Sequence, residues 1–417
     1  MGPISKREIT IKAKEVGFEK HSDSKIKAHD LLLSFFWMIG MVEISYSCWA
    51  SCLKISTEKI VSKQAIFKRM NHCWVKLVKQ LVTQSIQHHI SSSKLIGSSF
   101  GFKNIYIQDS TTISLPDILK ALFPGNISRG KQKAIAKINA VINLNTGLCC
   151  HLGITGFTTN EQKLSGSILD IAKAGDLVIR DMGYFVLSVF KKMDSENIYF
   201  ISRLKYGIAL FKDDQRIGLL RLLRNKSKID LQVQCGQEKL PVRLIAVKLS
   251  QEQASEKIRK AKKDRDKRLN HTKEYYESLN YIFMITNIEN SKCTANQITE
   301  IYRIRWQIEI MFKSWKSCLN IEGMIPSAKC RTERVESIIY MLLLFVLWFE
   351  KKIMARLNLE NISIIKLTKE IVMNLHKYLM NDLCAADIEY LEKKCQYEKR
   401  DRVNASQRLS NIFSPFG

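Results

Sequence analysis

Residues 295–317 carry the most regular alternation of hydrophobic and polar positions in the chain. Apolar residues recur there at the three- and four-residue spacing of a helix: Ile304, Ile308, Met311 and Trp315. Thr294 and Gln297 have the spacing of a capping box, which starts a helix. The pattern therefore predicts one continuous helix over 295–317 with its apolar side in a core.

The opposite side of this helix presents a row of functional groups. At about 100° per residue, four polar residues share an arc of roughly 60°: Tyr302, Arg305, Glu309 and Lys316. A solvated helix surface also carries mixed charges, so the face alone is weak support for a site. The spacing Tyr-x2-Arg-x3-Glu-x6-Lys is the more specific feature.

Two short apolar runs, 104–111 and 176–181, are typical of buried strands. Asp109 stands near the end of the first run and Asp181 at the end of the second. Strands that alternate with helices indicate an α/β fold with a mixed sheet, and ligands gather where such strands end. The alternative for Asp109 is a turn aspartate, which the following Ser-Thr-Thr favours.

The pattern divides the chain into helical and strand-rich parts. Between them, residues 137–155 predict a hairpin around Asn145-Thr146-Gly147. We expect a helical domain at 1–95, an α/β core in two parts at 96–204 and 281–350, a strand-rich insertion at 205–280 and a helical region at 351–417.

Two longer apolar runs, Leu31–Val42 and Ile338–Phe349, require a decision about membranes. Each is about 12 residues, shorter than the roughly 20 that a membrane-spanning helix needs. We interpret both as buried helices of a soluble protein.

The composition of the chain indicates which class of molecule it binds. The chain has 66 Lys and Arg against 40 Asp and Glu, a net charge of +26. Such an excess indicates a polyanionic partner, with nucleic acid first. The 11 cysteines are odd in number and contain no C-x-x-C pair, which fits reduced thiols in a cytosol. Cys48, Cys52, His72 and Cys73 do not have the spacing of a standard zinc site, so simple burial of these cysteines is the favoured reading.

Residues 56–87 leave two interpretations open. Ser62 can cap a second short helix, which gives a helix-turn-helix-like arrangement. Exposed residues of that helix would then face DNA: Lys63, Gln64, Lys68 and Arg69. The equal alternative is an ordinary helical bundle with a basic surface.

Three motifs together resemble bacterial insertion-sequence transposases of the DDE type, specifically the IS-four family. They are the first-aspartate strand IYIQDSTTISLP (105–116), the second-aspartate strand GDLVIRDMGYF (175–185) and the Tyr-Arg-Glu-Lys spacing above. The resemblance implies a ribonuclease-H-like core, an N-terminal helical DNA-binding domain and C-terminal helices that take part in a homodimer. It also implies that the protein acts in the bacterial cytoplasm, at the nucleoid, on terminal inverted repeats and target DNA.

Phosphoryl transfer on DNA can be catalysed by two divalent ions held by carboxylates. We expect Asp109, Asp181 and Glu309, which are 72 and 128 positions apart, to hold Mg²⁺ or Mn²⁺. Arg305 suits a bidentate phosphate contact and Lys316 a point contact, and Tyr302 can hydrogen-bond or stack. Two further DNA contacts are expected: Lys137, and Trp306 as a platform for a flipped base, with core packing as the alternative for Trp306.

The predicted function is therefore metal-dependent excision and integration of an insertion sequence. The resemblance adds a DNA-hairpin step. Two alternatives remain: a metal-dependent endonuclease without strand transfer, and an inactive DNA-binding remnant. Three carboxylates facing a polyanion argue against the remnant.

Overall fold

The computed structural model describes residues 5–21, 24–39, 41, 45–93, 101–128, 130–223, 226–263, 272–325 and 332–397. These residues form two compact units that interleave along the sequence. Unit 1 holds described residues from 1–97, 110–159 and 306–410, and unit 2 holds those from 98–109 and 160–305. The predicted domain boundary at 95/96 lies outside the described residues.

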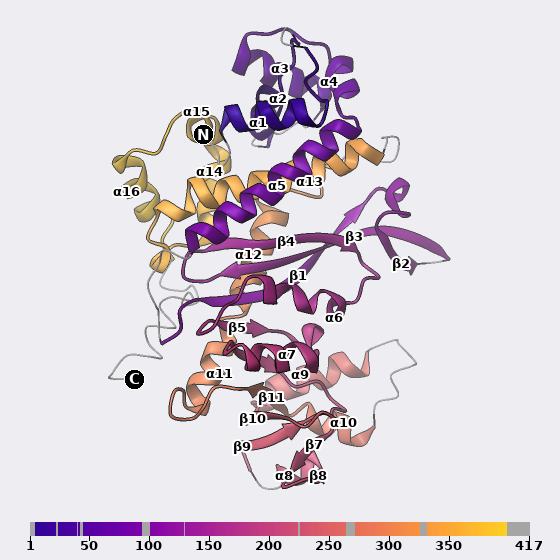
Figure 1. The fold of residues 1–417 in the computed structure, drawn as a ribbon, viewed down its shortest axis with the longest axis vertical. Helices are drawn as coiled ribbons and strands as arrows, with labels where there is room; N and C mark the ends of the chain where they lie inside the picture. The colour runs from indigo at the N-terminus through magenta and orange to yellow at the C-terminus, as the bar shows by residue number, and fades with distance from the viewer. Residues whose placement is uncertain are drawn as a thin grey trace. The chain divides into compact units, whose positions relative to one another are not determined.

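Unit 1 begins with helices, as the sequence predicts. They are α1 Lys6–Glu15, α2 Ala28–Met38, α3 Tyr46–Thr57, α4 Lys63–Arg69 and α5 His72–Ser93. Its second helical set is α12 Trp306–Ser317, α13 Thr332–Lys352, α14 Ile364–Met373, α15 Leu375–Met380 and α16 Ala385–Lys394. Helices α5 and α13 run side by side and lie against strand β4 (Figure 1). The N-terminal and C-terminal helices therefore share one core.

The strands of unit 1 are the second part of β1 Ile105–Leu115, together with β2 Pro124–Ser128, β3 Lys131–Asn143 and β4 Leu148–Gly156. Strands β3 and β4 form the predicted antiparallel hairpin, in which Ile138 pairs with Ile154. Gly147 has a φ of 67° at the turn, a conformation that glycine adopts without a steric cost.

The two apolar runs that raised the membrane question are buried helices. Residues 31–38 lie in α2 and residues 338–349 lie in α13. Among the described helices, none has the length and apolar character that crossing a membrane requires.

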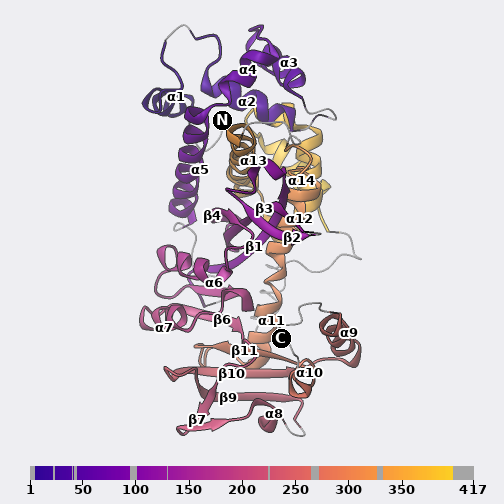
Figure 2. The same cartoon turned by 90° about the vertical axis from the view of Figure 1, so that its right-hand side faces the viewer.

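Unit 2 is built on a mixed sheet (Figure 2). Its strands are the first part of β1, then β5 Leu177–Arg180, β6 Tyr199–Arg203, β7 Leu210–Lys212, β8 Gln215–Ile217, β9 Lys228–Cys235, β10 Leu240–Lys248 and β11 Tyr281–Thr286. They lie in the order β1-β5-β6-β11-β10-β9-β7-β8. Strands β1, β5 and β6 are parallel, whereas β11, β10 and β9 continue the sheet in antiparallel fashion.

The α-helices of unit 2 connect and flank these strands. They are α6 Glu161–Leu164, α7 Leu187–Ser195, α8 Leu219–Leu222, α9 Gln251–Lys262, α10 Lys273–Ser278 and α11 Ala295–Arg303. The predicted α/β class, with helical regions at both ends and a strand-rich insertion, is confirmed. The candidate site lies where the parallel pairing of β1, β5 and β6 ends.

The prediction of one helix over 295–317 is wrong, because the chain forms α11 and α12 with a break between them. The backbone N–H groups of Ile304 and Arg305 bond to the carbonyls of Ile301 and Tyr302, three residues back, at 3.0 and 3.1 Å. This tighter turn interrupts the four-residue hydrogen-bond pattern of an α-helix. A single helical wheel therefore does not describe all four signature residues.

Candidate active site

Asp109 and Asp181 follow equivalent positions on two neighbouring parallel strands. Gln108 of β1 pairs in register with Arg180 of β5, so the next residue on each strand is an aspartate at the same level. Asp181 has an extended backbone, with φ −86° and ψ 168°, so it continues the direction of β5. Since successive side chains of extended chain alternate between faces, both aspartates lie on the face opposite Gln108 and Arg180.

A buried arginine fixes this register. Arg180 is fully buried and donates to Gln108 Oε1 at 2.6 Å and to the Ser165 carbonyl at 2.5 Å. Burial lowers the pKa of Arg180 to about 9, so its guanidinium remains charged at neutral pH. Charge-assisted bonds of this kind hold β1 to β5 directly before the two aspartates.

Tyr302 of α11 reaches Asp181. Its hydroxyl donates to Asp181 Oδ1 at 3.1 Å. Burial, followed by the negative charge of Asp181, raises the pKa of Tyr302, so the phenol keeps its proton. The contact orients the carboxylate and leaves its second oxygen available for another ligand.

Arg305 reaches the other aspartate. Its Nη1 lies 2.5 Å from Asp109 Oδ2, and the two side chains are only 18% and 16% exposed. An ion pair that excludes this much water is stronger than one on an open surface. Each predicted aspartate thus has one partner from the signature segment.

Glu309, Trp306 and Lys316 lie in α12, within unit 1. Glu309 is exposed, whereas Trp306 and Lys316 are partly exposed. Because seven residues make almost two helical turns, Glu309 and Lys316 lie on the same face of α12. Trp315 is buried and its ring meets Phe312 edge-on at 5.2 Å, so its predicted core role is confirmed. The place of Glu309 as the third carboxylate stays a prediction.

Lys137 lies in β3 and is held by its own chain. Its ammonium donates to the Thr159 carbonyl at 2.8 Å and lies 5.5 Å from the centre of the Phe157 ring. The residue is only 8% exposed, so these contacts give its predicted role in DNA binding no support. Lys131 and Lys133 on the same strand are exposed.

The short-helix reading of 56–87 agrees in part with the structure. Ser62 caps α4 by accepting from the Ala65 N–H at 3.2 Å, and Lys63, Gln64 and Lys68 are exposed. Arg69 instead donates to the Phe18 carbonyl at 2.8 Å and to the Ile26 carbonyl at 3.0 Å. Three of the four predicted contact residues therefore face solvent.

Arg203, which lies beside Asp181 on the next strand, was not predicted as a site residue. Arg180 pairs in register with Ser202 of β6, which sets Arg203 level with Asp181. A signal was present in the sequence, because Arg203 ends the run of β6 much as Asp181 directly follows that of β5. An arginine at a strand end is commonly a solvated side chain, so its position alone did not single it out.

The residues of this edge have the chemistry that a hard divalent ion requires. Mg²⁺ and Mn²⁺ take carboxylate oxygens and water, and two carboxylates stand on adjacent strands here. Within the described ranges, no three His, Cys, Asp or Glu side chains are grouped closely enough to hold an ion. Arg305 and Tyr302 instead satisfy the two carboxylates.

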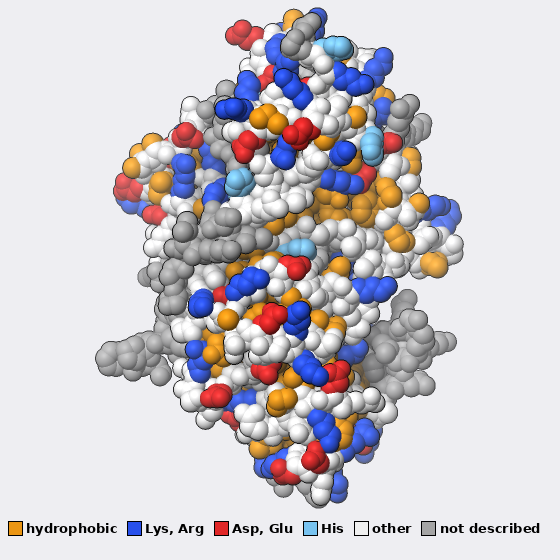
Figure 3. All heavy atoms as spheres, viewed as in Figure 1, with side chains coloured by type: hydrophobic (Ala, Val, Ile, Leu, Met, Phe, Trp, Pro, Cys, Tyr) orange, Lys and Arg blue, Asp and Glu red, His pale blue; other side chains and the backbone are white. Residues whose placement is uncertain are grey.

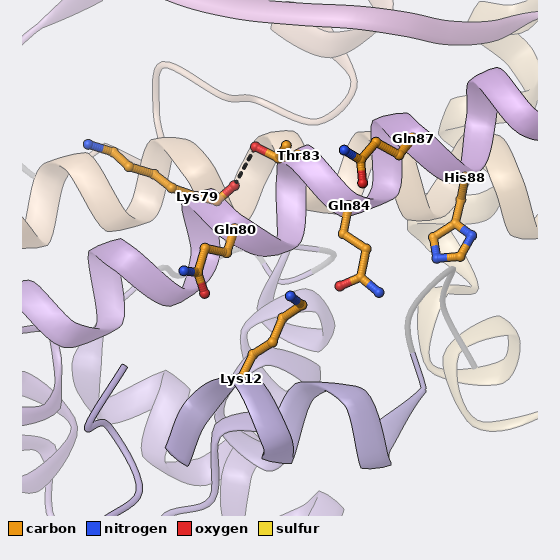
Figure 4. A pocket seen from close by; sticks show the side chains of 7 residues that line it. All are labelled: Lys12, Lys79, Gln80, Thr83, Gln84, Gln87 and His88. Atoms are coloured by element: carbon orange, nitrogen blue, oxygen red, sulfur yellow. Dashed lines mark hydrogen bonds between the residues drawn. The ribbon is translucent and has the colours of Figure 1, made fainter. Parts of the chain in front are cut away.

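A groove in unit 1 is a second candidate for a ligand site. It has a volume of about 690 Å³ and lies between α1 and α5 (Figure 4). Its lining is polar: Lys12, Lys79, Gln80, Thr83, Gln84, Gln87 and His88. Gln84 donates to Glu8 Oε1 at 3.1 Å, and Thr83 donates to the Lys79 carbonyl at 3.2 Å. None of the predicted site residues lines this groove.

On the face drawn in Figure 3, Lys and Arg side chains are interspersed with acidic ones. The side chains of this face therefore do not locate a site, and the position of the candidate site rests on the strand register.

Two aspartates stand side by side where the pairing of β1 with β5 ends, and Arg305 and Tyr302 contact them. This arrangement is typical of a DDE-type phosphoryl transferase. A family model described as "Transposase DDE domain" matches residues 100–347. The chain belongs to this family, which makes it a DNA transposase of the insertion-sequence type with a dependence on divalent metal ions.

Curated relatives agree with this assignment. The chain is 27% identical over 354 residues to the transposase for insertion sequence element IS231E of Bacillus thuringiensis subsp. finitimus, covering 79% of this chain and 73% of that protein. It is 26% identical over 360 residues to the transposase for insertion sequence element IS1151 of Clostridium perfringens, covering 80% and 75%. These relatives confirm the predicted IS-four family.

A solved structure of the piggyBac transposase synaptic complex with hairpin DNA also aligns with the chain. The TM-score is 0.45 at 10% identity, over 95% of this chain and 83% of that one.

Proposed function

We propose that Asp109, Asp181 and Glu309 form the catalytic carboxylate set and hold two Mg²⁺ or Mn²⁺ ions. The observation that carries the proposal is the register of β1 and β5, which sets two aspartates side by side directly after the last paired residues of the two strands. Bound ions would supply positive charge to the phosphate and lower the pKa of a water molecule.

Arg305 has two roles in this proposal. Before DNA binds, it neutralises Asp109 through their ion pair. Once the carboxylate serves as a ligand, the planar guanidinium is free to bind a phosphate of the DNA through two hydrogen bonds. The ion pair therefore keeps the site folded and stable until its substrate arrives.

The other signature residues contact the DNA or orient the site. Tyr302 holds Asp181 and can donate to a nearby phosphate oxygen. Lys316 gives a point charge to the backbone from the face of α12 that carries Glu309. Trp306 is partly exposed, which suits stacking on a base rotated out of the duplex. Lys137 is the weakest of the proposed contacts, because its ammonium already has partners.

The reaction proceeds by cut and paste. A water oxygen bonds to phosphorus, the bond from phosphorus to the 3′ oxygen breaks, and that oxygen takes a proton. The new 3′-hydroxyl attacks the opposite strand and displaces another 3′ oxygen, which closes a DNA hairpin. Water opens the hairpin, and the released 3′ end joins target DNA by the same exchange of phosphate bonds.

The remaining regions have supporting roles in the proposal. Residues 1–95 bind terminal inverted repeats, 96–204 and 281–350 form the core, 205–280 is an insertion, and 351–417 contributes to a homodimer. The protein acts in the bacterial cytoplasm at the nucleoid. The exposed Lys63, Gln64 and Lys68 of α4 support a DNA-binding role for the first region.

A cleavage assay tests the proposed function. Purified protein with Mg²⁺ or Mn²⁺ meets a duplex bearing the DNA that flanks its gene, and the products are resolved on a denaturing gel. We expect a metal-dependent nick and then a hairpin, both absent with Glu309→Ala. Random degradation that needs Glu309 would favour the nuclease, and binding without cleavage in either protein would favour the inactive remnant.

A further inference from the structure

The groove between α1 and α5 contains none of the residues assigned so far to catalysis. Its volume is about 690 Å³, and all of the residues that line it are polar. Helix α5 supplies the lining from Lys79 to His88, which extends roughly 14 Å along the helix. Helix α1 supplies Lys12 from the opposite side (Figure 4). The groove is therefore elongated and suits a polar ligand.

Two of the lining side chains carry polar groups that the protein itself does not satisfy. Within the described part of the chain, the ammonium of Lys12 has no hydrogen-bonded or ion-paired partner, and neither has the amide of Gln80. Figure 4 shows both side chains pointing into the space between the two helices. A cation and an amide in this position can donate hydrogen bonds to an anionic ligand.

Other lining groups already have partners. Lys79 forms an ion pair with Glu336 of α13, and Gln84 donates to Oε1 of Glu8 on α1 at 3.1 Å. The 22 residues of α5 include no Asp or Glu, so this helix offers an anion no carboxylate to repel it. Of the two lysines in the lining, Lys12 is thus the one whose charge a ligand would neutralise.

This combination of donors is the one that proteins use on the DNA backbone. Half to two-thirds of protein–DNA hydrogen bonds go to phosphates and sugars, and Lys, Gln and Thr side chains are among the donors. Thr83 and Gln87 of α5 also line the groove and are exposed, so they extend the polar surface beyond Gln80. A sugar–phosphate strand is elongated and anionic, and it matches the groove in both respects.

We propose that the groove between α1 and α5 holds the sugar–phosphate backbone of one strand of a DNA duplex, with Lys12 on a phosphate and Gln80 donating to a phosphate oxygen beside it. This inference rests on the proposed function and deepens it, because it adds a contact surface on α1 and α5 to the exposed residues of α4. Phosphate contacts position a protein without reading the bases, so the contact does not depend on the DNA sequence.

The salt dependence of DNA binding measures the Lys12 contact. Each phosphate neutralised on duplex DNA contributes about 0.9 to the slope of log affinity against log salt concentration. Lys12→Gln should therefore lower the slope by about 0.9. Gln80→Ala should weaken binding by roughly tenfold and leave the slope unchanged, because a neutral donor displaces no counterion.

The experiment uses the full chain and fluorescein-labelled duplexes, followed by anisotropy over a salt series. One duplex bears the DNA that flanks the gene, and the other has an unrelated sequence. The matched control is Lys14→Gln, because Lys14 lies on α1 as well, is exposed, and does not line the groove. Circular dichroism confirms that each variant is folded. Lys12→Arg, which keeps the charge, should keep the slope.

A second measurement depends on no substitution. Wild-type protein is treated with an acetylating reagent with and without the unrelated duplex, and mass spectrometry reports the modification of each lysine. Bound DNA should reduce the acetylation of Lys12 severalfold and that of Lys14 much less. Equal protection of the two lysines, or a wild-type slope in Lys12→Gln, would overturn the inference.

The two duplexes test the nature of the contact. A slope that falls with both of them in Lys12→Gln supports a backbone contact. A slope that falls only with the flanking DNA would mean that the groove recognises bases, and would overturn the proposal of a backbone contact.

The test separates this inference from the proposed function. Wild-type protein that does not bind either duplex would count against the function itself, and against the groove with it. Wild-type protein that binds and cuts DNA, with unchanged slope and affinity in the Lys12 and Gln80 variants, would remove only the role of the groove.

Discussion

At the scale of single residues, Asp109 and Asp181 are prepared for their role by different partners. Asp109 meets the guanidinium of Arg305, and Asp181 meets the neutral hydroxyl of Tyr302. A cation that is paired with a carboxylate opposes the binding of a metal ion to that carboxylate. A neutral hydrogen-bond donor in the same place opposes it much less. We therefore expect the two carboxylates to differ in how readily they accept an ion.

Removing the cation should strengthen metal binding while it weakens catalysis. Without DNA, Arg305→Gln should bind Mn²⁺ more tightly than wild type, by roughly an order of magnitude, because a nearby positive charge is lost. Cleavage of DNA should fall, because the phosphate contact is lost as well. Isothermal titration calorimetry and the cleavage assay measure the two effects.

The matched control is Arg303→Gln, since Arg303 lies two residues before Arg305, at the end of α11, and pairs with the partly exposed Glu300 instead. It should leave Mn²⁺ affinity unchanged. Equal Mn²⁺ affinities for wild type and Arg305→Gln would contradict a competition between Arg305 and the ion for Asp109.

At the scale of elements, α11 carries Tyr302 and leads directly into the turn that holds Arg305, and it depends on its own first turn. Thr294 accepts from the Gln297 N–H at 3.3 Å, and Gln297 Oε1 accepts from the Thr294 N–H at 2.8 Å, which is the predicted capping box. The cap satisfies backbone donors that the helix cannot.

Thr294→Ala should therefore loosen the start of α11 by about 1 kcal/mol. Hydrogen–deuterium exchange should become roughly fivefold faster at the Gln297 and Ile298 amides. Ser291→Ala, in the preceding exposed loop, is the control and should leave these amides unchanged. Unaltered exchange in Thr294→Ala would show that tertiary contacts alone hold the first turn.

Helix α13 contributes a buried carboxyl group to the core of unit 1. Glu350 is fully buried, and its Oε2 accepts from the Cys149 N–H of β4 at 2.8 Å. Burial raises its pKa from 4.5 to about 8, so it is protonated in the folded protein at neutral pH. Nearby His89 has its pKa lowered by burial to about 4 and is therefore neutral.

These shifts predict how stability depends on pH. Because the pKa of Glu350 is raised, its contribution to the stability of the fold is complete below pH 4.5 and is lost as the pH rises through about 8. The contribution of His89 is complete above 6.5 and is lost as pH falls toward 4. Between pH 6.5 and 8, Glu350 is the one of these two groups whose contribution to the free energy of unfolding still changes. That contribution falls by roughly 2 kcal/mol over this range.

Urea unfolding of Glu350→Gln across this window should show a flatter dependence on pH than wild type. Glu336→Gln changes a carboxylate on the same helix that pairs with Lys79, and should keep the wild-type slope. Parallel curves for wild type and Glu350→Gln would mean that Glu350 is ionised in the folded state.

At the scale of the whole molecule, the sequence predicted the class and the position of Asp181 directly after a strand, because an apolar run followed by a carboxylate is a local pattern. The predicted strand end near Asp109 is wrong, because β1 continues to Leu115. The sequence did not predict the break after α11, which depends on hydrogen bonds at Ile304 and Arg305. Nor did it show that Lys137 would donate to the Thr159 carbonyl, because the two residues are 22 positions apart and meet only in the folded hairpin. Arg203 required the strand register, which only the fold supplies.

Two interleaved units carry the proposed carboxylates, since Asp109 and Asp181 belong to unit 2 and Glu309 to unit 1. The chain passes from one unit to the other directly after Asp109 and again after Arg305.

The most direct test of the account is a strand-transfer assay with a labelled, pre-cut element end, a supercoiled plasmid and Mg²⁺. Wild type and Glu300→Gln should join the labelled end to the plasmid, and Asp181→Asn and Glu309→Gln should not. Plasmid cutting without joined label, or joining that survives in Glu309→Gln, would contradict a transposase that uses this carboxylate set.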